Sequence, residues 1–396
     1  MAKSGDPVDG AEIIQRLEAL VPVLRERGRA AEEAGRIPEQ TVQDLIASGV
    51  FRAVVPRRFG GHEVAFRHVP QIFRTLGRGC MSTAWTMGFL VYHNFQFAHF
   101  PEEAQQEVWG KGRGFTMAPG QVMPAGKAMA AEGGYRLTGR WGYATGINHG
   151  DWMLLSAPVE GGENNGAILR FFVPVEKFRI LDTWKVAAMR ATGSHDVELA
   201  DEFVPAYRSV KVSDLRGGTA AGLANNPGSL WRIPLLSFMS IGAVGPLVGA
   251  AEAMFEFVTD SLRNKVRAYS VNQAQQQMST RVRLAEIAMR LKSVTTLFEK
   301  IAVDVEESAA RGQALSVAQR AEIRAAMSYI AGQSQAIVNA LAGEAGSRSN
   351  YLDSPIQRFQ RDANALATHA LFDMDHTGDQ YAHTLLGMEL PPGAMV

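Results

Sequence analysis

Residues 133–152 read GGYRLTGRWGYATGINHGDW and indicate a sheet in the middle of the chain. Short apolar or alternating runs of this kind are typical of strands, and Gly133-Gly134 and Thr138-Gly139 are typical of turns. The runs that predict strands are YRLTGRW (135–141), DWMLLSAPV (151–159), AILRFFVPV (167–175) and VKVSDL (210–215). We therefore expect a β-domain, of a barrel-like kind, over residues 113–215.

The residues before this β-domain have the spacing of helices. Apolar residues recur at intervals of one, three and four between Ala11 and Gly35, where Pro22 is expected to kink the helix. Pro38 and Gly49 are typical of the start and end of a second helix. Ser82 is placed to cap a buried helix over 82–99, and another helix is expected after residue 101. We expect an N-terminal helical domain over residues 1–112.

The C-terminal part returns to helical spacing after a polar, glycine-rich stretch at 216–229. The run RVRLAEIAMRLKSVTTLFEKIAV, at 281–303, predicts a long amphipathic helix. We expect a C-terminal helical bundle of the four-helix type over residues 216–396. The fold class is therefore α+β, with helices first, then strands, then a helical bundle.

Composition excludes several kinds of protein. The 396 residues contain 40 basic and 40 acidic side chains, so the formal net charge is zero and the basic footprint of a nucleic-acid binder is absent. No run of apolar residues is long enough for a membrane span, and the first residues do not resemble a secretory signal. The single cysteine, Cys80, cannot form an internal disulfide. We expect a cytoplasmic protein that binds neither nucleic acid nor membrane.

Motifs for several common chemistries are missing. Gly110, Gly112 and Gly114 precede a predicted strand rather than a helix, so they do not form the glycine fingerprint of an NAD(P)H site. His369, His376 and His383 are spaced by seven residues, about 10.5 Å along a helix, and cannot share one metal ion. No G-x-S-x-G motif is present for a serine hydrolase. We expect no metal site.

Three stretches resemble the acyl-CoA dehydrogenase superfamily, and the resemblance extends over nearly the whole chain. IPEQTVQDLIASGVFRAVVPRRFGG (37–61) resembles the N-terminal helix and turn of that family. The opening stretch at 133–152 resembles the segment that lines the flavin, and MRATGSHDVELADEFVP (189–205) resembles the second signature of the β-domain. The resemblance implies the architecture that the segments predict.

The C-terminal stretch favours one branch of that family over another. Acyl-CoA dehydrogenases need a carboxylate base, whereas the corresponding stretch 358–387 has no glutamate and contains histidine. Arg361, Asp362, Ala365 and His369 have the spacing of the flavin-dependent monooxygenases of this fold, and YHNF (92–95) resembles a second histidine position of that branch. The chain thus resembles the oxygenase components of two-component systems, such as the aromatic hydroxylases and dibenzothiophene monooxygenases.

This resemblance implies a cofactor, partners and a reaction. The cofactor would be reduced flavin, FMNH2 or FADH2, supplied by a separate NAD(P)H-flavin reductase. O2 would react through a flavin C4a-hydroperoxide to oxygenate a small aromatic substrate, phenolic or indole-like. A histidine suits the task of a base because its ordinary pKa is near neutrality. A homotetramer is also implied.

The resemblance assigns three catalytic candidates. Thr145 falls where the family places a hydroxyl beside flavin N5; otherwise it is a residue of a turn. His93 is a site residue or a satisfied core histidine. His369 would act on the substrate or the hydroperoxide, with Asp373 one helical turn further on to orient its ring. His376 and His383 are expected on the bundle surface or at a subunit interface.

Further residues are candidates for contact with the cofactor. Trp141 and Tyr143 either face the flavin or pack the strands. Arg190 and Ser194, with Thr192, either border the flavin or form a turn around Gly193. Arg267 either reaches a flavin phosphate across a subunit boundary, as the fork of an arginine allows, or is a solvated charge.

Three alternative functions remain open from the sequence. One is an acyl-CoA dehydrogenase or oxidase, which would retain oxidised FAD and be bleached by an acyl-CoA. Another is an N-oxygenase of an amine or amino sugar with the same fold. A third is a scaffold that keeps the fold and binds no flavin.

Overall fold

The N-terminal part of the computed structural model is helical, as expected. The structure describes residues 8–110, 112–264, 275, 277–391 and 393–396. Its first helices are α1 (Gly10–Ala34), α2 (Glu39–Ser48), α3 (His68–Gly79), α4 (Met81–Phe97) and α5 (Glu102–Trp109). α1 runs through Pro22 to Gly35, and α2 ends at Gly49; both glycines are left-handed, as a helix end favours.

The predicted cap of α4 is wrong by two residues. Cys80, in extended conformation, occupies the N-cap position, and Ser82 lies inside the first turn. The reason is that α3 and α4 are separated by this single residue, so the chain must re-enter a helix at once. Sixteen of the seventeen residues of α4 are buried, which makes it the central helix of the N-terminal part.

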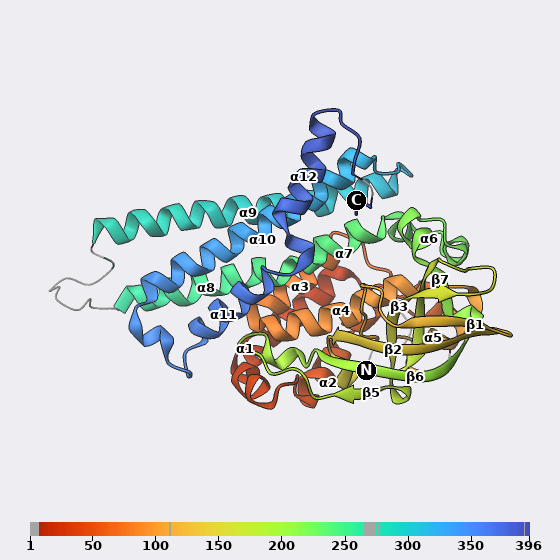
Figure 1. The fold of residues 1–396 in the computed structure, drawn as a ribbon. Coiled ribbons are helices and arrows are strands. Elements are labelled where there is room, and N and C mark those ends of the chain that lie inside the picture. Colours follow the sequence, from red (N-terminus) through yellow and green to blue (C-terminus); the bar gives the residue numbers. More distant parts are fainter. Residues whose placement is uncertain (1–7, 111, 265–274, 276, 392) are drawn as a thin grey trace.

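A seven-stranded sheet follows, in the order β5-β6-β2-β1-β3-β4-β7. The strands are β1 (Lys127–Ala131), β2 (Gly134–Ala144), β3 (Trp152–Glu160), β4 (Ile168–Pro174), β5 (Arg179–Leu181), β6 (His195–Pro205) and β7 (Ser209–Lys211). All neighbours pair antiparallel except β1 and β3. The sheet lies at one end of the helical body (Figure 1).

Two details of the predicted β-domain are corrected. Thr138-Gly139 is not a turn: β2 continues through it, and a shift of register between Leu137 and Gly139 absorbs the glycine. The run 210–215 is a strand only to Lys211, where helix α6 (Val212–Gly217) begins. The left-handed Gly218 ends that short helix.

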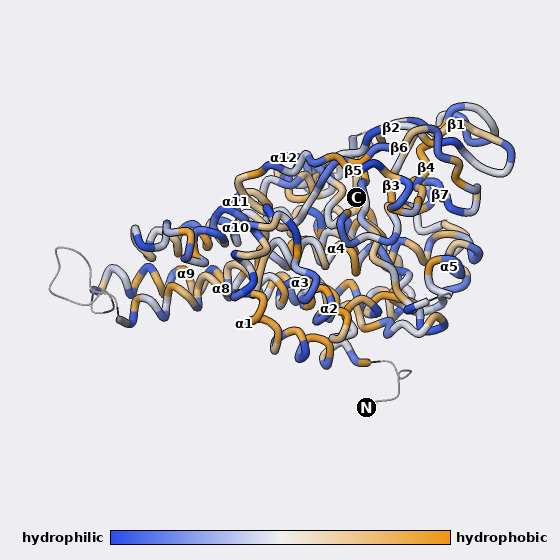
Figure 2. The backbone as a smooth tube through the Cα atoms, turned by 90° about the horizontal axis from the view of Figure 1, so that it is seen from below, coloured by the Kyte–Doolittle hydropathy of each residue, from blue (hydrophilic) through white to orange (hydrophobic). Residues whose placement is uncertain are grey.

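The C-terminal helices are α7 (Leu235–Ala243), α8 (Gly245–Asn264), α9 (Met278–Ala310), α10 (Val317–Ala345), α11 (Pro355–Leu366) and α12 (Met374–Leu385). Figure 1 shows α8, α9, α10 and α11 side by side as an elongated bundle, and hydrophobic and hydrophilic residues alternate along α9 in Figure 2. One stretch of the described residues, Leu235–Arg263, is apolar enough to cross a membrane, but 83 % of its apolar window is buried in the fold. That burial is typical of core helices.

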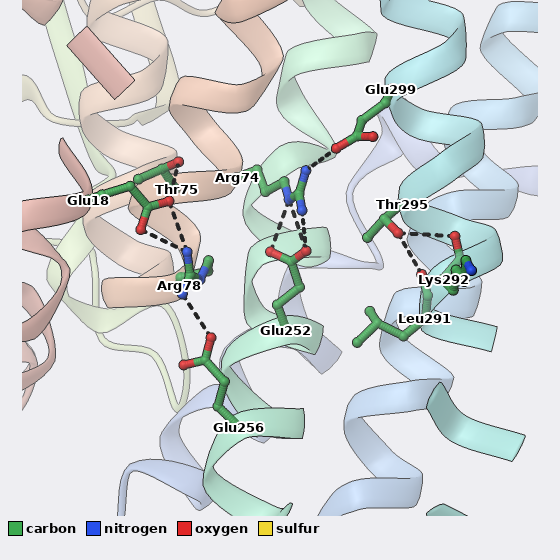
Figure 3. Close-up of polar contacts among 10 residues, drawn as sticks. All are labelled: Glu18, Arg74, Thr75, Arg78, Glu252, Glu256, Leu291, Lys292, Thr295 and Glu299. Carbon is green, nitrogen blue, oxygen red and sulfur yellow. Dashed lines mark hydrogen bonds and ion pairs between the residues drawn. The ribbon is translucent and has the colours of Figure 1, made fainter. Parts of the chain in front are cut away.

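The two helical parts share one hydrophobic core, whereas the β-domain has its own. Ion pairs reinforce the junction between the helical parts, as Figure 3 shows. Arg74 on α3 pairs with Glu252 on α8 and with Glu299 on α9, each at 2.5 Å. Burial works against its charge, yet the hydrogen bonds and charges of the two glutamates raise the pKa of Arg74. The C-terminal bundle is thereby fixed to the helices that carry the site.

Candidate active site

One face of α4 carries an aromatic ladder of Trp85, Phe89 and His93. Their spacing of four residues places them on the same side of the helix. The Trp85 and Phe89 rings meet edge to face at 4.5 Å, and the Phe89 and His93 rings are 5.6 Å apart. Phe89 is the one residue of α4 that is not buried, so its ring is partly accessible. The ladder therefore presents a partly exposed aromatic ring between Trp85 and His93.

His93 is buried, and its tautomer is fixed by one contact. Nδ1 lies 2.5 Å from the backbone oxygen of Ala118, which can only accept, so Nδ1 carries the proton. Nε2 then presents a lone pair. Burial lowers the pKa of His93 to about 3, and the charge of Arg170 adds to the shift. The imidazole is therefore neutral at physiological pH and acts as a hydrogen-bond acceptor.

Arg170 on β4 is a neighbour of His93, and it is unusual for an arginine because only 2 % of it is exposed. Its Nη1 donates to the backbone oxygen of Gln121 and to Ser156, while Nε and Nη2 make no hydrogen bond within the described part of the chain. A Cβ atom on Gly120 would lie 2.9 Å from Nη2 of Arg170 and 3.0 Å from Nε2 of His93. Gly120 therefore lets the imidazole and the guanidinium pack against the same backbone.

His369 reaches the other end of the ladder. Its ring meets Trp85 edge to face at 5.1 Å. The N–H of Leu371 donates to Nδ1 at 3.2 Å, so the proton of the neutral ring is on Nε2. Much of the residue faces solvent, but its ring is desolvated by the side chains around it. This desolvation, together with the charge of Arg324, lowers the pKa of His369 to about 4. His369 is thus a neutral hydrogen-bond donor.

Two expectations about His369 are wrong. It does not lie on a helix with Asp373, because α11 ends at Leu366 and His369 caps a short 3-10 turn. Asp373 instead accepts from the N–H groups of Asp375 and His376 and caps α12. The near-neutral pKa expected of a base is also absent, since desolvation lowers the pKa of both His93 and His369.

Thr145 lies just after β2 and is tied to the loop before β6. Its hydroxyl is 2.9 Å from that of Ser194, which is 2.8 Å from that of Thr192. The next residue, Gly146, touches α4, because a Cβ on it would lie 2.8 Å from the methyl group of Thr86. Three hydroxyls therefore form a line that ends beside α4, and Thr145 is its half-buried end.

The loop that carries Ser194 is held by α11. Asp362 accepts a hydrogen bond from the N–H of Met189, which is left-handed at φ 52°. Arg361 donates to the backbone oxygen of Ala187 and pairs with Glu32 at 2.6 Å. Burial raises the pKa of Asp362 to about 6, although the Met189 N–H and Arg361 favour its charge. The end of the bundle thus fixes the position of the β-domain loop.

A hollow of about 440 Å³ opens next to this loop, within the range of small-molecule sites. Arg190 and His195 line it together with Trp184 and the end of α1. Arg190 is exposed, and no ion pair is seen for it among the described residues. Tyr143, 68 % exposed and left-handed, stands edge-on to Trp184 at 5.9 Å. Its side chain is thus available at the rim of the β-domain.

Trp141 does not border an open site. It is fully buried in the core of the β-domain, and its indole N–H donates to the backbone oxygen of Ser156 at 3.0 Å. Of the two interpretations of this residue, strand packing is the one the structure supports. Arg267 lies outside the described residues. Among those that are described, no cluster of three or more His, Cys, Asp or Glu side chains is arranged to hold a metal ion.

The structure brings the candidate residues next to one helix, α4, but at different points along it. Eight residues separate the two ends of the ladder, about 12 Å along α4. His93 and His369 therefore lie at opposite ends, and the hydroxyls approach the helix at Thr86 between them. Sequence reasoning missed the roles of Asp362 and Arg170. Burial is what distinguishes these two charged side chains, and the burial of a single residue cannot be predicted from its local sequence.

Two family models match the chain. The model described as the N-terminal domain of acyl-CoA dehydrogenase matches residues 18–112, and the model of the C-terminal domain matches residues 241–374. These ranges cover most of the helices that precede and follow the sheet in the chain, and they include the aromatic ladder and His369.

Individual relatives match nearly the whole length. The chain is 31 % identical to an FADH(2)-dependent resorcinol hydroxylase, oxygenase component, from Rhizobium sp., over 95 % of this chain and 94 % of that protein. A crystal structure of 3-HSA hydroxylase from Rhodococcus sp. RHA1 superposes with a TM-score of 0.92 at 28 % identity, covering 97 % and 99 % of the two chains. XiaF from Streptomyces sp., in complex with FADH2 and glycerol, gives 0.91 at 27 %, covering 97 % of both.

Proposed function

Since the chain belongs to the acyl-CoA dehydrogenase family and is an oxygenase component of the flavin-dependent, two-component type, we propose that it oxygenates a small aromatic substrate, phenolic or indole-like. The observation that carries the substrate class is the partly exposed ring of Phe89 on α4. On one side this ring lies beside His93, a hydrogen-bond acceptor, and on the other side Trp85 separates it from His369, a donor. This arrangement suits a flat apolar molecule with polar substituents. Resorcinol, the substrate named for the Rhizobium relative, is of this class.

The residues present fit a flavin. Thr145 offers a half-buried hydroxyl with a fixed partner, and Arg190 offers an unpaired guanidinium at the hollow, where an anionic phosphate is a suitable ligand. We propose that Thr145 lies beside flavin N5 and that Arg190, with Arg267 of the stretch outside the described residues, contacts the rest of the cofactor. When bound, reduced FMN or FAD supplies two electrons to O2, so that one oxygen atom enters the product and the other leaves as water.

The two histidines have opposite hydrogen-bonding roles. His93 accepts a hydrogen bond through Nε2, and His369 donates one through Nε2–H. We propose that His93 orients a hydroxyl or N–H of the substrate, while His369 donates to the oxygen that is transferred. Neither ring takes up a proton near pH 7, because both pKa values are far below it. Their task is to hold geometry and exclude side reactions with water.

The dehydrogenase alternative receives no support from the carboxylates near His369. Asp362 is buried and holds Met189, and Asp373 caps α12, so neither is free to remove a proton from an acyl chain. A base for that reaction needs an accessible carboxylate within reach of the substrate. No observation singles out amine oxygenation either, so we keep one function.

We propose that a separate NAD(P)H-flavin reductase supplies the cofactor and that the enzyme is a cytoplasmic homotetramer. Met278, Val282 and Met289 are 66 %, 51 % and 59 % exposed along one side of α9. A second copy of the chain would cover this stripe of apolar side chains. The helix that carries it, α9, is one of the long helices of the bundle (Figure 1).

The test is a direct assay of oxygen transfer. The purified chain, a flavin reductase, NADH and either FMN or FAD are mixed with a panel of phenols, indoles, amines and an acyl-CoA under ¹⁸O2. We expect ¹⁸O in a phenol or indole product. Incorporation only into an amine, or reduction of bound FAD by the acyl-CoA without oxygen transfer, would contradict the proposal.

A further inference from the structure

The line of hydroxyls beside α4 has a direction that can be worked out from its contacts. Its members are Thr145, Ser194 and Thr192, at successive distances of 2.9 and 2.8 Å. Ser194 and Thr192 are 3 % and 2 % exposed, so water does not compete for their protons. Each hydroxyl carries one proton to donate. The direction of the hydrogen bond at one end therefore fixes the directions of the other hydrogen bonds in the line.

The inner end is fixed by a carbonyl group. Thr192 Oγ1 lies 2.9 Å from the backbone oxygen of Met189. Two oxygens this close need a hydrogen between them, and a carbonyl can only accept, so the proton of Thr192 points to Met189. That carbonyl is held in place because its oxygen also accepts from the backbone N–H of Thr192 at 3.1 Å and from the indole N–H of Trp184 at 3.2 Å.

The remaining protons follow by counting. Thr192 has no proton left for Ser194, so Ser194 donates to Thr192. Ser194 then has none left for Thr145, so Thr145 donates to Ser194. The oxygen of Thr145 presents only lone pairs to whatever lies on its open side.

We propose that Thr192 and Ser194 are positioning residues that make Thr145 a hydrogen-bond acceptor and thereby select reduced over oxidised flavin. This inference rests on the proposed function, which places Thr145 beside N5. In reduced flavin N5 bears a hydrogen and donates; in oxidised flavin N5 has a lone pair and faces the lone pairs of Thr145. The site therefore favours the form that a reductase delivers and disfavours the form that remains after turnover.

The experiment compares affinities and does not depend on activity. Dissociation constants of oxidised and reduced FMN and FAD are measured by titration, the reduced forms under anaerobic conditions. Ser194→Ala frees the Thr145 proton, and Thr192→Val lets Ser194 donate to Thr145 instead. In both variants we expect the ratio of oxidised to reduced dissociation constants to fall about tenfold, the value of one hydrogen bond. The midpoint potential of the bound flavin should fall by about 30 mV.

Two controls separate direction from structure. Thr192→Ser keeps the hydroxyl and should keep the wild-type ratio. Thr384→Val removes a hydroxyl on α12 that, like Thr192, donates to the carbonyl three residues earlier, at Tyr381, and should also leave the ratio unchanged. If Ser194→Ala does not fold, the pair Thr192→Val and Thr192→Ser decides the question.

The outcomes are distinguishable. A wild-type chain that binds neither form of flavin would overturn the proposed function. Binding of flavin with the same ratio in Thr192→Val as in wild type would overturn the direction of the hydroxyls and leave the proposed function intact. An equal fall of the ratio in Thr192→Ser would also overturn it, because the effect would then follow any change of packing at this position and not the loss of the hydroxyl.

Discussion

The carboxylate of Asp362 accepts a hydrogen bond from the backbone N–H of Met189 at 2.6 Å, although 173 residues separate them in sequence. This contact joins α11 of the bundle to the loop that carries the buried hydroxyls. It holds the backbone of Met189 in a left-handed conformation that an ordinary side chain rarely adopts.

Removing this acceptor should weaken both the fold and the site. Asp362→Ala leaves a buried N–H without a partner, so we expect the free energy of unfolding to fall by about 1–3 kcal/mol and flavin affinity to fall with it. Asp362→Asn keeps an acceptor oxygen and serves as the control. Urea denaturation and flavin titration measure the two effects. Equal losses in both variants would show that the charge, not the hydrogen bond, matters.

Stability should fall as the pH is lowered from 6.5 to about 4. His93 and His99 are buried with pKa values lowered to about 3 and 4, so the unfolded chain, with pKa near 6.5, binds more protons in this range. Their contribution is complete above pH 6.5 and is lost on acidification. Asp362, raised to about 6 from its ordinary 3.8, acts in the opposite direction, but two histidines outweigh one carboxyl.

The measurement is the urea midpoint at several pH values. His99→Gln should flatten the decline, because His99 is buried away from the proposed flavin contacts and its Nδ1 lies 3.2 Å from the backbone oxygen of Phe95. A wild-type midpoint that stays constant from pH 7 to pH 5 would contradict the assignment of neutral, buried histidines.

His369→Ala should uncouple flavin oxidation from product formation. The loss of one Nε2–H donor corresponds to about tenfold in the ratio of product to hydrogen peroxide. His369→Gln retains an N–H donor and should recover part of the coupling. Because the pKa of His369 is about 4, coupling in the wild type should be constant between pH 6 and pH 8. Full coupling in the alanine variant would remove His369 from the site.

The junction between the helical parts should depend on Arg74. Glu252→Gln removes the charge of a carboxylate whose side chain is 15 % exposed, and we expect a loss of about 2 kcal/mol in the free energy of unfolding, between the values for exposed and fully buried pairs. Glu33→Gln, in the exposed pair with Arg29 on α1, is the control and should change it by less than about 0.5 kcal/mol. Similar losses in both would contradict a special role of the junction.

The apolar stripe of α9 should be needed for assembly. Met289→Asp places a charge where we propose that a second copy packs, so sedimentation should show dissociation into smaller species. Met123→Asp makes the same change at an exposed methionine of the β-domain, 67 % exposed, and should leave the assembly unchanged. A tetramer that survives Met289→Asp would exclude this surface.

Local sequence signals were sufficient for most of the elements. Gly35 and Gly49 end their helices as predicted, because a left-handed helix end needs no information from the rest of the fold. Ser82 misled because capping depends on where the preceding helix ends. Gly139 misled because a glycine in a strand forms a bulge as readily as a turn, and only pairing with β6 decides between them.

The site was harder to predict because it is made by long-range contacts. Thr145 and Ser194 were identified by resemblance, but their direct contact depends on how β2 and β6 lie in the sheet. His369 was expected on a helix because its spacing to Asp373 fits one turn, whereas the chain leaves the helix at Leu366. The lowered pKa of His93 follows from burial against Arg170, a residue 77 positions away in the chain.

The opposite tautomers of His93 and His369 give the aromatic ladder of α4 a polarity. A molecule lying on Phe89 would have the lone pair of His93 on one side and the N–H of His369 on the other. Turning such a molecule end for end would place donor against donor and acceptor against acceptor. The enzyme would therefore recognise which way round its substrate lies, and the position that is oxygenated would follow from that orientation.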